Sequence, residues 1–133
     1  MMLLGTLLAR GRPKWQIIKR PRTSLGYAVQ AQFHIRHQSL EFLLWIQREL
    51  DQKEIRSKIR GHENWQRTKH YTLEIGKRKD QYSLVDYLTK VSPIELNFGR
   101  WPTYLEAIEI IRNREHLTQD GMDKLMILKG LIE

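Results

Sequence analysis

Residues 27–36 alternate between apolar and mostly polar side chains, and this pattern constrains the fold more than any other part of the sequence. The first row consists of Tyr27, Val29, Ala31, Phe33 and Ile35, and the second of Ala28, Gln30, Gln32, His34 and Arg36. A period of two places the rows on opposite faces of a β-strand. We therefore expect a sheet with one face covered by a core and one face open.

The open face of this strand would carry amide, imidazole and guanidinium groups. Glutamine pairs well with adenine and arginine with guanine, so such a row suits contact with base edges. An ordinary solvated strand face is the alternative interpretation.

The remaining patterns predict an ordered series of helices and strands. We expect a helix over Leu3–Gly11, strands over 15–20 and 54–60 and 69–75, and helices over 39–50, 80–90, 101–114 and from Thr118 onward. Ser39 and Thr118 are predicted helix N-caps, Pro102 suits a first turn, and Pro93 ends the helix before it. The predicted buried helix residues are Leu40, Leu43, Leu44, Leu50, Tyr82, Leu84, Val85, Leu88, Leu105, Ile108, Ile111, Leu125, Leu128 and Leu131.

The charge is concentrated at the beginning of the chain. The 133 residues carry a net charge of +8, and residues 1–40 contain seven Lys or Arg and no Asp or Glu. A basic surface of this kind indicates nucleic acid or anionic lipid as the partner. The alternative is a basic protein that has no polyanion partner.

The apolar residues 1–9 are too few to span a membrane, and we predict no membrane partner. The length allows one domain, residues 1–133.

The predicted strand over residues 54–60 gives a second argument for a polyanion. Arg56, Lys58 and Arg60 would share one face, opposite Ile55 and Ile59. Three neighbouring cations on one face repel one another unless a polyanion neutralises them.

The stretch Leu3–Gly11 resembles the signature helix of the LAGLIDADG homing endonucleases, a helix that packs backbone to backbone against a second copy. Gly5 and Ala9 occupy the small positions and Gly11 the closing glycine, but Arg10 stands where the family has an acidic residue. Ile111–Thr118, followed by Gly121, resembles the closing segment of the single-motif, organelle-encoded branch. The predicted order of elements is also the αββαββα order of this family.

The resemblance implies an α+β fold, a LAGLIDADG domain with a four-stranded antiparallel saddle whose concave face contacts nucleic acid. A dimer or partner contact would use Leu4, Gly5, Leu8 and Ala9. The implied nucleic-acid contacts are Arg10, Arg12, Lys14, Gln16, Lys19, Arg20, Arg22, Gln30, Gln32, His34, Arg36, Arg56, Lys58, Arg60 and Lys69, with His70 and Thr72 as further candidates.

Two departures from the family pattern predict an inactive catalytic site. The family reaction needs carboxylates to hold a divalent metal, and the guanidinium of Arg10 has no ligand oxygen. Ile94 stands where the family has a lysine near the scissile phosphate, and Asn97 stands at a family aspartate. We therefore predict no catalytic residue, no cofactor and no metal, including at His34 and His37.

These residues and the resemblance leave three candidate functions. The first is a catalytically inactive protein that binds structured RNA through its basic sheet, as an intron maturase-like protein or a mitochondrial ribosomal or ribonucleoprotein component. The resemblance implies a mitochondrion or plastid as its location. The alternative is an active homodimeric LAGLIDADG homing endonuclease that makes Mg²⁺-dependent double-strand cuts in DNA, with Glu41, Asp51 or Glu95 as the metal ligand. The third is a basic structural subunit without a specific ligand.

Overall fold

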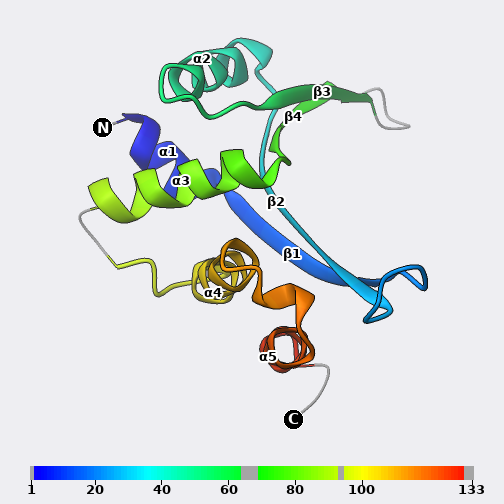
Figure 1. Cartoon of the computed structure of the whole chain (residues 1–133). Coiled ribbons are helices and arrows are strands. Elements are labelled where there is room, and N and C mark those ends of the chain that lie inside the picture. Colours follow the sequence, from blue (N-terminus) through cyan, green and yellow to red (C-terminus); the bar gives the residue numbers. More distant parts are fainter. Residues whose placement is uncertain (1, 64–68, 93–94, 131–133) are drawn as a thin grey trace. The chain divides into compact units, whose positions relative to one another are not determined.

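The computed structural model describes residues 2–63, 69–92 and 95–130. Its elements are α1 (Met2–Arg10), β1 (Arg12–Lys19), β2 (Tyr27–His37), α2 (Leu40–Asp51), β3 (Lys58–Glu63), β4 (Lys69–Ile75), α3 (Arg78–Val91), α4 (Trp101–Arg112), the short 3₁₀ helix η1 (Glu115–Leu117) and α5 (Gln119–Leu128) (Figure 1). This order confirms the predicted α+β chain. The predictions for Pro93, Ile94 and Leu131 lie outside the described residues.

The four strands are hydrogen-bonded in the order β1-β2-β4-β3. In the antiparallel register Ile35 faces Leu73 on β4, which in turn faces Ile59 on β3. Val29, Phe33 and Ile35 are buried, so this part of the predicted apolar row of β2 forms the covered face, whereas Tyr27 at the start of the strand is 37% exposed. The described residues fall into two compact units, one of 2–13, 32–63, 69–92 and 95, and the other of 14–31 and 96–130.

The first unit has its core beneath β2 and β4. Leu7 of α1, Ile46 of α2 and Leu84 of α3 are fully buried there, and α2 lies against both β3 and β4. Burial of each such side chain stabilises the unit by roughly 1.5–3 kcal/mol. The outward-facing side chains of the central strands are therefore held on a packed support.

The second unit joins the turn end of the β1–β2 hairpin with α4 and α5. Arg20 N–H donates to the Gly26 carbonyl at 2.9 Å, and Gly26 takes the positive φ of 77° that favours glycine in a tight turn. Lys129 Nζ lies 4.5 Å from the Trp15 ring centroid. Burial, and then the positive charge of Arg100, lower the pKa of Lys129.

The predicted caps form, and they explain much of the closing segment. Ser39 Oγ accepts the Phe42 N–H at 3.2 Å, and Thr118 Oγ1 accepts the Gly121 N–H at 3.0 Å. A Cβ at Gly121 would overlap the Glu115 carbonyl. This stretch therefore requires its cap and its glycine for packing.

Two predicted strands have different boundaries. β1 begins at Arg12, not at residue 15, and includes Pro13 because an edge strand tolerates proline. β3 begins at Lys58, not at residue 54, because the turn that ends α2 continues through Glu54, which has φ 60°. Arg56 therefore precedes β3.

The buried face of α2 was predicted incorrectly in part. Leu40 and Leu44 are 38% and 40% exposed, whereas Leu43, Ile46 and Leu50 are buried. The buried stripe follows spacings of three and four residues through Ile46, which places Leu40 and Leu44 at its edge.

The later helices show smaller differences. α3 begins at Arg78 and buries Leu84 and Leu88 as predicted, but Tyr82 and Val85 are only half-buried. α4 ends at Arg112, with Ile108 and Ile111 buried as expected. Leu105 was expected to be buried but is half-buried, and Tyr104 is buried instead. The Tyr104 ring packs edge-on against the Trp101 ring, with 5.9 Å between the ring centroids. Leu125 of α5 is buried and Leu128 is half-buried. No described helix has both the length and the apolar character to cross a membrane.

Candidate nucleic-acid interface

The end of α1 combines a required glycine with exposed small residues. A Cβ at Gly11 would overlap the Leu7 carbonyl and the Phe33 ring, so packing of α1 on β2 requires glycine there. Gly5 and Ala9 are exposed, and a Cβ at Gly5 would meet nothing within 4 Å. Of the other predicted partner-helix residues, Leu4 is buried within the chain and Leu8 is half-buried.

Arg10 and Arg12 flank Gly11, and both side chains are exposed. Arg10 lies in the last turn of α1, where a cation interacts favourably with the partial negative charge of the helix C-terminus. The end of this helix therefore presents two guanidinium groups.

We call the outward face of β2, β4 and β3 the central-strand surface, and it lies within the first unit. Its register places His34 and Lys58 on either side of Glu74, and Arg36 and Arg60 on either side of Thr72. Together with Gln32, these residues share one polar face, whereas Lys69 has the strand parity of Tyr71 and Leu73 and falls on the opposite face of β4.

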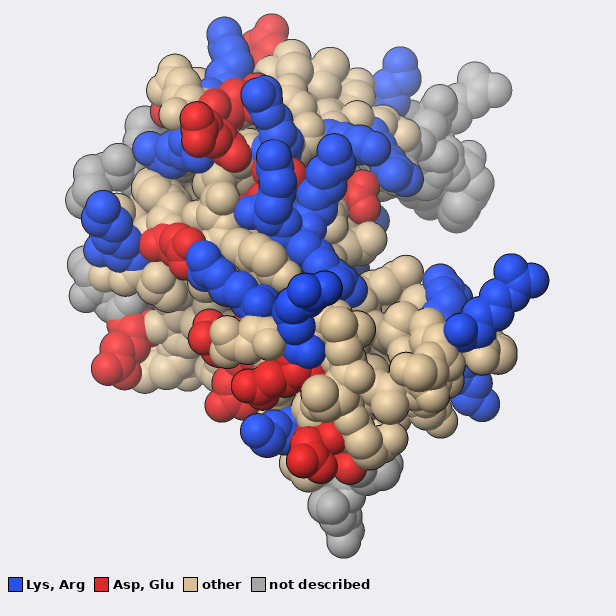
Figure 2. Space-filling model, viewed as in Figure 1, with Lys and Arg blue, Asp and Glu red and all other residues tan. Residues whose placement is uncertain are grey.

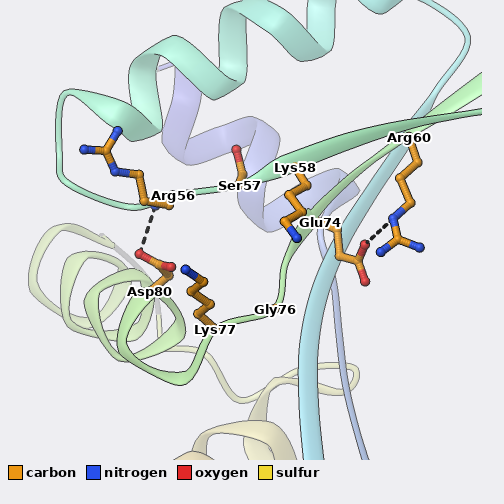
Figure 3. Close-up of a pocket in the computed structure, with 8 residues that line it drawn as sticks. All are labelled: Arg56, Ser57, Lys58, Arg60, Glu74, Gly76, Lys77 and Asp80. Carbon is orange, nitrogen blue, oxygen red and sulfur yellow. Dashed lines mark hydrogen bonds and ion pairs between the residues drawn. The ribbon is translucent and has the colours of Figure 1, made fainter.

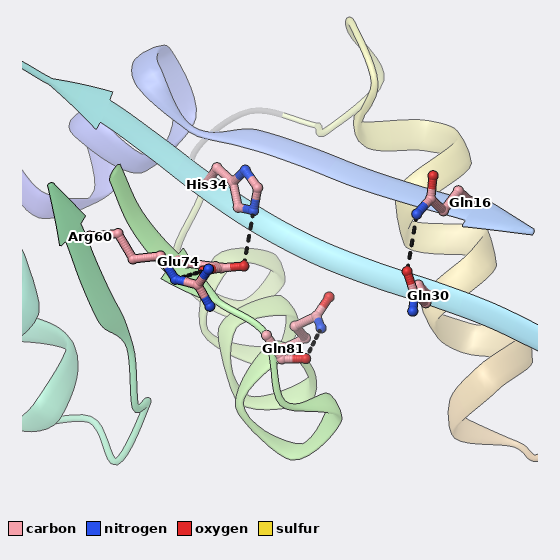
Figure 4. A network of polar contacts seen from close by, with 7 residues as sticks. Gln16, Gln30, His34, Arg60, Glu74 and Gln81 are labelled. Atoms are coloured by element: carbon pink, nitrogen blue, oxygen red, sulfur yellow. Dashed lines mark hydrogen bonds and ion pairs between the residues drawn. The ribbon is translucent and has the colours of Figure 1, made fainter. Parts of the chain in front are cut away.

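Glu74 holds the centre of the central-strand surface, and it was not among the predicted contact residues. Its carboxylate lies 3.3 Å from Arg60 Nε and 3.6 Å from His34 Nε2, and its side chain is only 16% exposed (Figure 4). A signal for it exists in the sequence: Tyr71, Leu73 and Ile75 form an apolar row of period two, which turns Glu74 to the opposite face.

The argument from three unneutralised cations was wrong. Arg56 lies before β3, and its Nη1 is 3.6 Å from Asp51 Oδ1. Arg60 is paired with Glu74, which leaves Lys58 as the member of the three without an ion pair in the described part of the chain. Lys69 is exposed at the start of β4, and His70 and Thr72 are half-buried.

We call the second group the hairpin surface, and it lies within the second unit. It consists of Lys14, Gln16, Lys19, Arg20, Arg22 and Gln30, all of them exposed. Gln16 Nε2 donates to Gln30 Oε1 at 3.0 Å, so these two amides lie side by side on β1 and β2 (Figure 4). Trp15 is buried, which fixes Lys14 and Gln16 on the open face. Residues 14–31 contain no Asp or Glu.

The structure is similar to solved homing endonucleases. I-TnaI matches with a TM-score of 0.79 and 17% identity over 96% of this chain and 82% of its own. I-SmaMI bound to cleaved DNA matches with a TM-score of 0.81 and 21% identity, over 98% of this chain and 42% of its own. The LAGLIDADG meganuclease I-CpaMI bound to uncleaved DNA matches with a TM-score of 0.77 and 22% identity, over 96% of this chain and 41% of its own. This chain has the LAGLIDADG homing-endonuclease fold.

Sequence comparison adds nothing to this result, because no family model and no curated protein matches the chain. The chain spans about four fifths of I-TnaI and about two fifths of I-SmaMI and I-CpaMI. The LAGLIDADG fold was predicted from the motif helix and from the order of elements, and that prediction is confirmed.

The end of α1 in this LAGLIDADG fold does not fit a magnesium ion. Mg²⁺ requires hard oxygen ligands, whereas Arg10 and Arg12 offer only N–H donors. Among the residues that the structure describes, no group of three or more His, Cys, Asp or Glu side chains could hold a metal.

Proposed function

We propose that this chain is a nucleic-acid-binding protein that does not cut its ligand, and that the ligand is a structured RNA. The observation that carries the proposal is the exposed pair Arg10 and Arg12 at the end of α1. The family resemblance places a metal-binding carboxylate at Arg10. Guanidinium groups instead form strong bidentate hydrogen bonds with phosphate.

The two surfaces supply what such a protein needs for binding. The hairpin surface has four cations in a segment without an acid, and exposed cations of this kind release counterions when they contact phosphates. The central-strand surface offers His34 and Arg36 as hydrogen-bonding groups. Phosphate contacts position a ligand and contacts to base edges select it.

RNA is favoured because some relatives in the family that the chain resembles act as intron maturases. In a mitochondrion or plastid, the ligand would be an intron RNA or a ribosomal RNA. RNA and DNA supply the same phosphate attraction, so the preference must come from shape and the 2′-hydroxyl.

The test is a binding titration of the purified protein against a structured RNA and a duplex DNA at two salt concentrations, with Mg²⁺ present. We expect tighter binding to RNA, affinity that falls with salt, and uncut strands after incubation. Arg10→Asp is the matched variant, because it restores the acidic residue of the motif. Site-specific DNA cleavage by the wild type would overturn the inactive-site proposal, and equal salt-sensitive binding to both ligands would overturn the RNA preference.

The alternative is an active homodimeric endonuclease with Mg²⁺ as its cofactor, and the similarity to DNA-bound I-SmaMI and I-CpaMI favours it. Glu41, Asp51 and Glu95 are exposed, but Asp51 pairs with Arg56. A dimer that packs two α1 helices together would need Gly5 to stay small. Sedimentation of Gly5→Leu tests this: a variant that remains dimeric would show that α1 does not form the dimer contact.

A further inference from the structure

A cavity of about 270 Å³ lies within the first unit, between the start of β3, the end of β4 and the first turn of α3. Of the eight residues that line it, four are cationic and two are acidic. The eight are Arg56, Ser57, Lys58, Arg60, Glu74, Gly76, Lys77 and Asp80 (Figure 3). Arg56 is paired with Asp51 and Arg60 with Glu74, so the charge open to an anion is that of Lys58 and Lys77.

Both carboxylates of the cavity are already engaged. Asp80 is 1% exposed, and its Oδ1 accepts the backbone N–H of Arg56 at 3.0 Å. Glu74 is held by Arg60 and His34. These contacts fix the walls of the cavity, and they leave its positive charge in excess.

Lys58 and Lys77 provide that excess charge. Lys58 is the first residue of β3 and Lys77 precedes α3, and their side chains reach from these two elements into the same space (Figure 3). Both are exposed, and none of the ion pairs in the described ranges involves either of them. They are therefore available to an external anion.

The residues at the start of α3 are unfavourable for an isolated helix. Lys77 is the N-cap residue without a side-chain cap, Arg78 and Lys79 follow it, and Asp80 is the acidic residue of the first turn. N-caps favour Ser, Thr, Asp or Asn, and cations are disfavoured beside the positive end of the helix dipole. Figure 2 shows lysine and arginine side chains gathered over this junction of β4 and α3. Asp80 offsets part of this electrostatic cost, and a bound anion would offset more of it.

We propose that this cavity binds one backbone phosphate of the nucleic acid, with Lys58 and Lys77 as its principal contacts. The inference rests on the proposed function and adds a contact, Lys77, that the sequence patterns did not predict. Lysine acts on phosphate as a mobile point charge, so the contact would position the ligand without reading its sequence.

The test uses Lys77→Ser, which should change binding and stability in opposite directions. Serine supplies the missing cap and should raise the melting temperature by about 3 °C. It should also weaken binding to a stem-loop RNA and to a duplex DNA by about three- to tenfold at low salt, and lower the slope of log K against log salt by about 1. Lys90→Ser, in the last turn of the same helix, is the matched control and should leave affinity within about twofold.

The outcomes separate this inference from the function on which it rests. If the wild type binds neither nucleic acid, the proposed function fails. If the wild type binds and Lys77→Ser loses no more affinity than Lys90→Ser, only the phosphate cavity is overturned.

The last probe is inorganic phosphate, added at constant ionic strength while the melting temperature is measured. If it raises the melting temperature of the wild type while Lys77→Ser binds nucleic acid normally, the cavity takes free phosphate and the nucleic-acid inference is wrong.

Discussion

The central-strand surface and the hairpin surface carry the same kinds of side chain in different electrostatic surroundings. On the central strands Glu74 lies within ion-pair distance of Arg60 and His34. On the hairpin, Lys19, Arg20 and Arg22 take part in none of the ion pairs in the described part of the chain. One surface is partly neutralised before any ligand arrives, and the other is not.

This difference indicates how the two surfaces divide the work of binding. A cation that already faces a carboxylate gives a polyanion less net attraction, because the carboxylate repels the phosphate. An uncompensated cation gives its full share of counterion release. We therefore expect the hairpin surface to supply most of the salt-dependent affinity and the central-strand surface to hold side chains in a fixed arrangement.

The largest effect should come from disrupting the support of the central-strand surface. In Gly11→Ala the new Cβ overlaps the Leu7 carbonyl and the Phe33 ring, and overpacking of this kind costs about 3 kcal/mol of unfolding free energy. Gly5→Ala on the same helix is the control and should gain up to about 1 kcal/mol, because its Cβ meets nothing. Denaturant unfolding measures both, and equal stabilities would show that α1 does not pack on β2 as described.

The next effect tests the comparison directly with two matched double variants. Lys19→Gln with Arg20→Gln should weaken RNA binding about tenfold and lower the log–log salt slope by about 2. Arg36→Gln with Arg60→Gln removes the same formal charge but should weaken binding only about threefold, because Glu74 already offsets Arg60. Salt-dependent titrations measure both slopes. A larger loss from the central pair would reverse the proposed division of work.

The smallest effect comes from Glu74, and it should have opposite signs on binding and on stability. Glu74→Gln removes a carboxylate from the face that meets phosphate, so affinity should rise about threefold. It also weakens the contacts to Arg60 and His34 and should cost about 1 kcal/mol of unfolding free energy. Glu106→Gln, exposed on α4, is the control and should change neither quantity. Weaker binding by Glu74→Gln would show that Glu74 orders the surface more than it repels the ligand.

Local patterns predicted most of the elements, because each pattern reflects a constraint that acts within a few residues. The alternation of β2, the Ser39 and Thr118 caps and the order of helices and strands all appear in the structure. The start of β3 was placed incorrectly because the turn at Glu54 depends on a backbone conformation with φ 60°, which that residue seldom adopts.

The candidate site depended more on tertiary structure than the elements did. The sequence by itself determined that the open faces of the strands are basic and polar, since period-two spacing assigns each side chain to a face. Only strand pairing decided that Glu74 lies beside Arg60 and His34, because these residues are far apart in the chain. The same folding brought Lys58 and Lys77 to one cavity. Charge is fixed residue by residue, whereas compensation of charge is a property of neighbours in space.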